Sequence, residues 1–217
     1  TAYGLGNVHL MLLSGIGKPY DPTTGKGVVG KNYAYQVQGA VTLFFEDKWF
    51  NPFIGAGALS KRIDDFHANE AFDHGKAGFI GGAALGAGSS GGRPIQYRPV
   101  PPGTPRWGSA WKRATAKWYQ QSTGINASSS NMPNRYSYLD LDPTYKNAFG
   151  QPLMRLTYNF TENDYKTRDY MTQKSFEIAK AMNPTIVTQP DTRRDDFSLI
   201  PYQTTQDRKS TRLNSSH

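Results

Sequence analysis

The stretch YAYQVQGAVTLFFE, residues 33–46, is a predicted β-strand. It is rich in aromatic and β-branched residues, which are the residue types enriched in strands, and it includes Val37, Val41 and Phe45. A second strand is predicted in RYSYLDLDP, residues 135–143, where we expect it to end at Pro143. A third is predicted in PLMRLTYNF, residues 152–160, because apolar and polar residues alternate there with the period of a half-buried strand.

Three helices are predicted around these strands. NVHLMLLSGIG, residues 7–17, is typical of the end of a helix followed by a glycine turn. RWGSAWKRATAKWYQQ, residues 106–121, is the second helix, and we expect its apolar stripe to pack in a core rather than to stack on sugars. The stripe consists of Trp107, Trp111, Ala114 and Trp118.

The third predicted helix follows Thr161 and ends before Pro184. Met171, Ile178 and Met182 share one of its faces. Between the first strand and the second helix, residues 47–105 show poor periodicity and many glycines and prolines. We expect long loops there, with a short strand near residues 96–100. The complete pattern predicts the α+β fold class.

Composition excludes several classes of protein. The 217 residues contain no Cys, so disulfide scaffolds, thiolate metal sites and cysteine nucleophiles are excluded. No apolar run approaches the roughly 20 residues of a membrane span. The formal net charge is +8, but no recognisable nucleic-acid-binding motif carries it, and we predict no nucleic-acid partner.

Two motifs suggest sites that the surrounding residues argue against. GAGSSG, residues 86–91, matches the G-x-G-x-x-G dinucleotide fingerprint, but the prolines that follow prevent the helix that would bind a pyrophosphate. His67, Glu70 and His74 could share a helical face, yet their spacing matches no standard zinc pattern. We therefore predict a flexible loop at the first motif and no metal site at the second. His9 lies in an apolar run and is expected to be a core histidine.

An ordered set of motifs resembles the glucose–methanol–choline family of flavoprotein oxidoreductases. LMLLSGIG (10–17) resembles the end of that family's second signature, and GVVGKNYAYQ (27–36) resembles the segment that follows it near the flavin. Further segments resemble the gluconate or sugar-alcohol dehydrogenase branch. These are GGRPI (91–95), GTPRWGSAWKRA (103–114), SYLDLDPTYKNAFGQPLMRLTY (137–158) and PYQTT (201–205).

The resemblance implies an antiparallel-sheet substrate domain with helices, plus a strip of an α/β FAD-binding domain. Residues 1–36 would belong to the FAD-binding domain, and residues 37–205 to the substrate domain and its return towards the flavin. The resemblance also implies that the native sequence ends at Thr205, so residues 206–217, in which only Leu213 is sizeable and apolar, are expected to be a non-native tail. The alternative left open is a disordered native tail. The family's Rossmann fingerprint would lie upstream of Thr1.

The resemblance implies cofactor-binding roles but assigns no catalytic residue. The candidates near FAD are Ser14, Gly15, Gly17, Gly30 and Asn32. In the gluconate branch the histidine that acts as general base is expected directly after YQTT, where this chain has Gln206. His217 is not expected to replace that base. We therefore expect this chain by itself to be inactive and not to hold FAD tightly.

The function implied is that of an FAD-dependent dehydrogenase. It would oxidise CH–OH groups of sugar acids, polyols or alcohols by hydride transfer to flavin and pass electrons to a cytochrome or quinone. The resemblance implies a periplasmic or membrane-associated location, which the residues themselves do not specify. The alternative left open is a non-enzymatic carbohydrate-binding module, because the chain has 13 Tyr, 11 Phe and 4 Trp that could stack on sugars.

Overall fold

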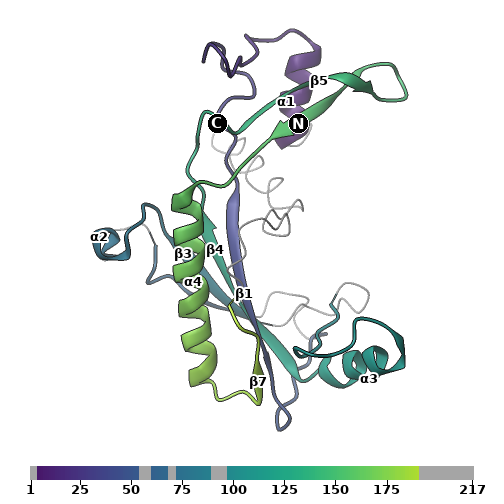
Figure 1. Cartoon of the computed structure of the whole chain (residues 1–217), viewed down its shortest axis with the longest axis vertical. Coiled ribbons are helices and arrows are strands. Elements are labelled where there is room, and N and C mark those ends of the chain that lie inside the picture. The colour runs from purple at the N-terminus through teal and green to yellow at the C-terminus, as the bar shows by residue number, and fades with distance from the viewer. Residues whose placement is uncertain (1–3, 54–59, 68–71, 89–96, 191–217) are drawn as a thin grey trace. The chain divides into compact units, whose positions relative to one another are not determined.

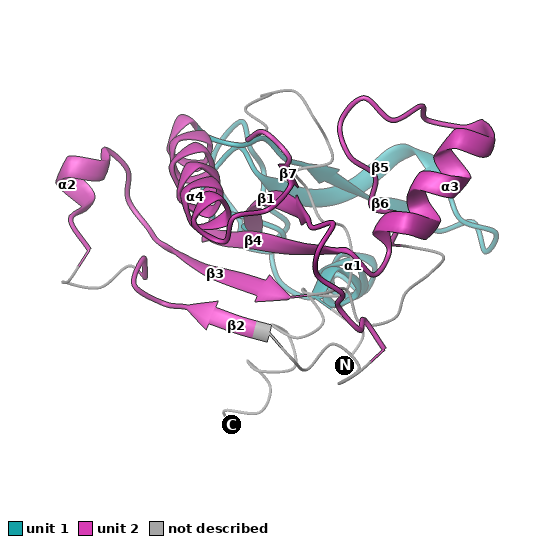
Figure 2. Ribbon diagram, turned by 90° about the horizontal axis from the view of Figure 1, so that it is seen from below, with its two compact units in different colours: residues 1–35, 131–161, 200–217 teal, residues 36–130, 162–199 magenta. Residues whose placement is uncertain are grey.

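A computed structural model describes residues 4–53, 60–67, 72–88 and 97–190 (Figure 1). The chain divides into two compact units, coloured separately in Figure 2. Unit 1 contains residues 1–35, 131–161 and 200–217, and unit 2 contains residues 36–130 and 162–199. The structure is mixed α and β, and its paired strands run antiparallel. The assignment of substrate and FAD-binding domains stays a prediction.

Unit 2 is built on a five-stranded sheet of order β2-β3-β4-β1-β7. The strands are β1 (Gln36–Phe44), β2 (Ser60–Ile63), β3 (Ala83–Gly88), β4 (Ser122–Ser130) and β7 (Ile186–Val187). β1 confirms the strand predicted within residues 33–46. It pairs with β4 over its whole length, so that Gln36 lies opposite Ser130 and Phe44 opposite Ser122.

Helix α4 (Glu162–Ala181) lies along one face of this sheet, as Figure 1 shows. Phe176 packs against Val41, Leu43 and Ile125, and Met171 packs in a neighbouring cluster. The predicted helix is confirmed, and it ends before Pro184. Its predicted apolar face is correct for Met171, which is fully buried, and wrong for Met182, which lies beyond the last helical residue and is 38% exposed.

Helix α3 (Gly108–Trp118) confirms the second predicted helix, but its aromatic stripe is only partly core. Trp118 is buried and meets the Phe44 ring edge-on, with centroids 5.3 Å apart. Trp107 is 83% exposed, which corrects the prediction for that residue. It precedes the first helical residue with extended backbone, so it does not continue the face of the helix.

Unit 1 contains α1 (Gly4–Leu13) and a two-stranded sheet of β5 (Tyr138–Lys146) and β6 (Pro152–Thr157). α1 and β6 confirm predicted elements. β5 does not stop at Pro143 as expected, because this two-stranded sheet leaves room for an irregularity. The register shifts between Leu141 and Lys146, and exposed Pro143 lies within the shift.

The region predicted to be mainly loops contains more regular structure than expected. It includes β2, β3 and the short helix α2 (His74–Ala77). The strand predicted near residues 96–100 is absent from residues 97–100, whereas residue 96 lies outside the described residues. Within the described ranges, no helix is long and apolar enough to cross a membrane.

Candidate functional site

A first candidate site, within unit 1, begins with the glycine turn that follows α1. The amide N–H of Ser14 still donates to the carbonyl of Leu10 at 2.9 Å, and that of Ile16 donates to Met11 at 2.9 Å. Gly15 and Gly17 then adopt left-handed φ values of 65° and 77°. These are conformations that glycine adopts without steric cost, and they end the helix. The sequence prediction of a helix end and glycine turn is therefore confirmed.

Gly17 and Gly30 are required by packing within unit 1. A Cβ on Gly30 would lie 2.0 Å from the carbonyl oxygen of Leu139, and φ is 89°. A Cβ on Gly17 would lie 2.8 Å from Cγ2 of Val29. Because the chain's own packing explains both glycines, their presence alone does not indicate a ligand.

Asn32 differs from these glycines because it has a side-chain amide that can form hydrogen bonds. Its φ is 55°, in the left-handed region that few non-glycine residues adopt. The side chain is exposed. Within the described parts of the chain, no hydrogen bond holds that side chain. An exposed amide on a backbone of unusual conformation could donate to or accept from a bound group.

A pocket of about 310 Å³ lies beside this segment within unit 1. Its lining is mostly apolar, and Lys31 and Tyr33 are the lining residues that carry polar side-chain groups. The lining residues are Val8, Met11, Val28, Val29, Gly30, Lys31, Tyr33 and Leu139. Of the five residues predicted to lie near FAD, Gly30 lines this pocket, and Ser14, Gly15, Gly17 and Asn32 do not.

A second candidate site is the sheet face of unit 2 that points away from α4. Val41, Leu43, Ile125 and Ala127 belong to the clusters of the α4 side, so the residues that alternate with them face the other way. Those on β1 and β4 are mainly polar or small, including Gln36, Gln38, Ala40, Thr42, Gly124, Asn126 and Ser128. Phe44, at the end of β1, is the large apolar exception and is buried against Trp118. Ser128 Oγ donates to Oε1 of Gln36 at 3.1 Å. This face combines amide and hydroxyl groups suited to binding a polyhydroxylated molecule.

Sequence reasoning missed this second site because β4 (STGINASSS) has the composition of a loop. A signal was nevertheless present, because Gln36 and Gln38 alternate with Val37 and Gly39 in the predicted strand. That alternation marks a polar face on β1. It does not reveal which strand lies beside it.

The motifs that the sequence argued against fall on ordinary structure. Gly86 and Gly88 belong to β3, so no helix opens at Gly86 as a dinucleotide fingerprint needs, and Gly91 lies outside the described residues. His67 Nε2 lies 3.1 Å from Oδ1 of Asp64, and Glu70 lies outside the described residues. In the ranges that the structure describes, no group of three or more His, Cys, Asp or Glu could hold a metal ion.

Two further sequence predictions concern His9 and the position at which a general base is expected. His9 is half-buried, and its Nε2 lies 2.9 Å from the carbonyl oxygen of Pro152, so this histidine contacts the backbone of β6. Gln206, at the position where the resemblance expects a general base, lies outside the described residues, as do YQTT and His217.

The chain is similar to a flavoprotein dehydrogenase. That relative is the gluconate 2-dehydrogenase flavoprotein of Pantoea cypripedii, which is 44% identical over 210 residues. The alignment covers 94% of this chain and 34% of the relative, so the chain spans about a third of the relative's length. No family model matches the chain. The resemblance to a gluconate dehydrogenase flavoprotein is therefore confirmed at this level, and membership of the glucose–methanol–choline family stays a prediction.

The residues of unit 1 fit part of a flavin and not a whole FAD molecule. The exposed polar groups of Ser14 and Asn32 could form hydrogen bonds, and the pocket beside Gly30 offers apolar surface. The described residues contain no strand–glycine–helix unit of the kind that holds a pyrophosphate. A flavin bound here would therefore be held by additional groups as well.

Proposed function

We propose that this chain is part of an FAD-dependent oxidoreductase that acts on CH–OH groups of sugar acids, polyols or alcohols. The observation that carries this proposal is the 44% identity to the Pantoea cypripedii flavoprotein over 94% of the chain. When bound, the flavin would accept a hydride from the carbon that bears the substrate hydroxyl. The chain's own residues would bind and orient the two reactants.

Each of the two candidate sites has a role in this proposal. Ser14, Gly15, Gly17, Gly30 and Asn32 would lie near the flavin, with Asn32 offering a hydrogen-bonding side chain. The polar sheet face of unit 2 would bind substrate hydroxyls through groups such as Gln38 and Asn126. No residue of the chain is assigned the role of general base, and a cytochrome or quinone is proposed as electron acceptor.

The composition of α1 supports the proposal that this chain works within a larger flavoprotein. Its sequence, GLGNVHLMLL, carries apolar side chains on all sides of the helix. No α1 residue is fully buried, however, and Leu10 is 55% exposed. A helix that is apolar all round is normally enclosed by protein or lipid, and α1 is too short to span a membrane. We therefore expect further protein to cover it.

A chimera tests the proposed function. Residues 1–205 of this chain replace the matching segment of the Pantoea cypripedii flavoprotein, so that the relative's own sequence follows YQTT. Bound flavin and substrate-dependent dye reduction are measured with gluconate and with polyols. We expect the chimera to retain flavin and to reduce the dye, whereas the 217-residue chain alone should do neither. An Asn32→Ala chimera should hold flavin more weakly. A folded chimera without flavin or turnover, together with sugar binding by the isolated chain, would instead favour a carbohydrate-binding module.

A further inference from the structure

The positive charge of the chain is concentrated in its middle third. Between Asp73 and Asp140 the sequence contains no Asp or Glu, whereas it contains eight Lys and Arg residues. Eight charges equal the formal net charge of the whole chain, so the remaining residues are balanced. The excess positive charge of the sequence is thus carried by residues 74–139.

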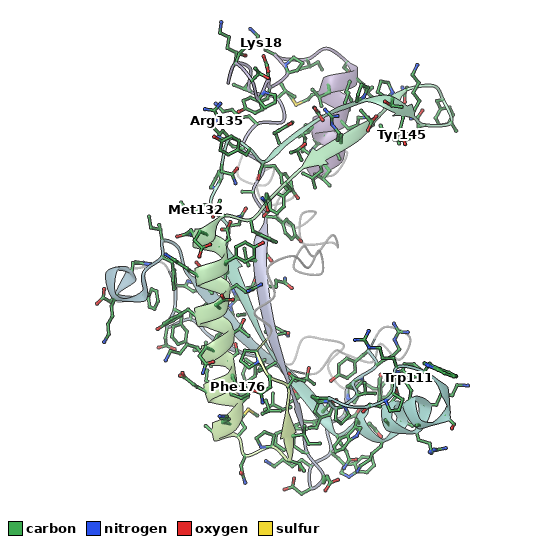
Figure 3. All side chains as sticks on the ribbon, in the orientation of Figure 1. Lys18, Trp111, Met132, Arg135, Tyr145 and Phe176 are labelled. Carbon is green, nitrogen blue, oxygen red and sulfur yellow. The ribbon has the colours of Figure 1, made fainter. Side chains whose placement is uncertain are left out.

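Much of this charge is displayed around α3 of unit 2. Arg98, Arg106, Lys112 and Arg113 all have exposed side chains. Lys117 pairs with Glu46 at 2.9 Å, but within the described residues no carboxylate lies within ion-pair distance of the other four. We call this set, with α3 itself, the α3 surface. Figure 3 shows the side chains of this helix, with Trp111 labelled.

The local energetics of α3 do not explain this arrangement. Arg113 and Lys117 are spaced four residues apart, so like charges face each other along the helix. The first turn of α3 contains no acidic residue, and Trp107 supplies no side-chain cap. The positive end of the helix dipole therefore adds to the positive electrostatic potential of the Lys and Arg side chains. These features make the isolated helix less stable, and an external anionic group would reverse the effect.

Exposed aromatic rings border the α3 surface. Trp107 is 83% exposed at the start of the helix. Trp49 is 72% exposed in the segment beside its other end, where Phe50 N donates to the carbonyl of Gln120 at 2.7 Å. Trp and Arg are the residue types most enriched at the energetic centres of protein–protein interfaces.

We propose that the α3 surface is a docking site for a protein partner whose contacting surface is rich in Asp and Glu. Charge complementarity selects an acidic partner, and the exposed Trp rings supply apolar contact that a free anion would not use. A bilayer fits less well, because an interfacial helix inserts its apolar face. In α3 that face is already occupied: Trp118 is buried on Phe44, and Trp111 and Ala114 are half-buried.

The test uses the 217-residue chain and immobilised poly-L-glutamate as the acidic polypeptide. The variant K112E/R113E reverses two charges on the α3 surface. Its matched control, K61E/K166E, reverses two exposed lysines elsewhere in unit 2 and changes the net charge equally. At low salt we expect the α3 variant to bind at least about tenfold more weakly and the control to change by less than about twofold. The neutral variant K112Q/R113Q should fall between wild type and K112E/R113E.

Two further measurements decide the nature of the partner. Binding of poly-L-glutamate should protect Trp fluorescence from acrylamide quenching, and Trp107→Phe should remove most of that protection, because Trp107 is the most exposed Trp. The same variants are tested with phosphatidylserine vesicles and with duplex DNA. Equal losses for K112E/R113E and K61E/K166E would mean bulk charge attraction and would overturn the proposal. A larger loss for vesicles or DNA than for poly-L-glutamate would also overturn it.

Discussion

Replacing Gly39 by Ala should lower the free energy of unfolding, because the added methyl group would clash with α4 where this helix contacts β1. A Cβ on Gly39 would lie 2.0 Å from Oγ1 and 3.2 Å from Cβ of Thr172. Thr172 is 1% exposed, and its Oγ1 has no hydrogen-bond partner within the described structure. The hydroxyl is held close to the β-carbon of its own residue, so it cannot swing far away. The helix or the strand must then move.

The expected cost follows from two opposing terms. Overpacking of a dense core costs about 1–3 kcal/mol. Replacing glycine by alanine in a strand interior returns about 0.5–1 kcal/mol. Gly39→Ala should therefore lower the free energy of unfolding by up to about 2.5 kcal/mol, with a central value of about 1 kcal/mol. Removing the hydroxyl in Gly39→Ala/Thr172→Ala should recover most of that loss, because the remaining close contact is the one with Cβ at 3.2 Å.

Urea unfolding followed by Trp fluorescence measures this prediction, because all four Trp residues belong to unit 2. Gly86→Ala is the matched control. Gly86 lies in the same sheet with an ordinary φ, and nothing lies within 4 Å of its added Cβ. It should be neutral or slightly stabilising. The packing explanation is refuted if Gly39→Ala is as stable as Gly86→Ala, or if the second substitution restores nothing.

Two further predictions concern Gly30 and Tyr97. Gly30→Ala should destabilise unit 1 by more than about 2 kcal/mol, because it combines a left-handed φ with a clash against the carbonyl oxygen of Leu139. The added Cβ of Gly15→Ala meets no atom within 4 Å, so this control should cost only about 1–2 kcal/mol, which is the cost of the left-handed φ. Hydrogen exchange at the Leu139 amide, which donates to Gly30 O at 2.8 Å, measures the difference. Burial raises the pKa of Tyr97 above its ordinary value of 10, while its hydrogen bond with Ser122 opposes the shift. The folded state favours the neutral phenol, so the contribution of Tyr97 to the free energy of unfolding is present below pH 10 and is lost as pH rises through the raised pKa. Midpoints of urea unfolding should show this pH dependence for wild type and not for Tyr97→Phe.

The candidate site could be predicted only in part. The glycine turn after α1 follows from local composition, because Ser14–Gly17 allow little else after an apolar helix. That Gly30 is needed for contact with Leu139 does not follow, because the two residues lie far apart in the sequence and nothing local indicates their contact. The polar sheet face depends equally on contacts between distant segments, since Gln36 and Ser128 meet only through strand pairing.

The sequence by itself determined the elements whose residues repeat a clear period. β6, α3 and α4 are each specified by side chains that recur with the spacing of a strand or a helix, and this information is local. Only the tertiary structure decided that β4 is a strand. Its residues, STGINASSS, have low intrinsic strand preference, and their extended backbone is stabilised by pairing with β1 on one side and β3 on the other. The close approach of Thr172 of α4 to Gly39 of β1 is likewise a contact between distant segments, and β4, with the composition of a loop, is the central strand of the unit 2 sheet.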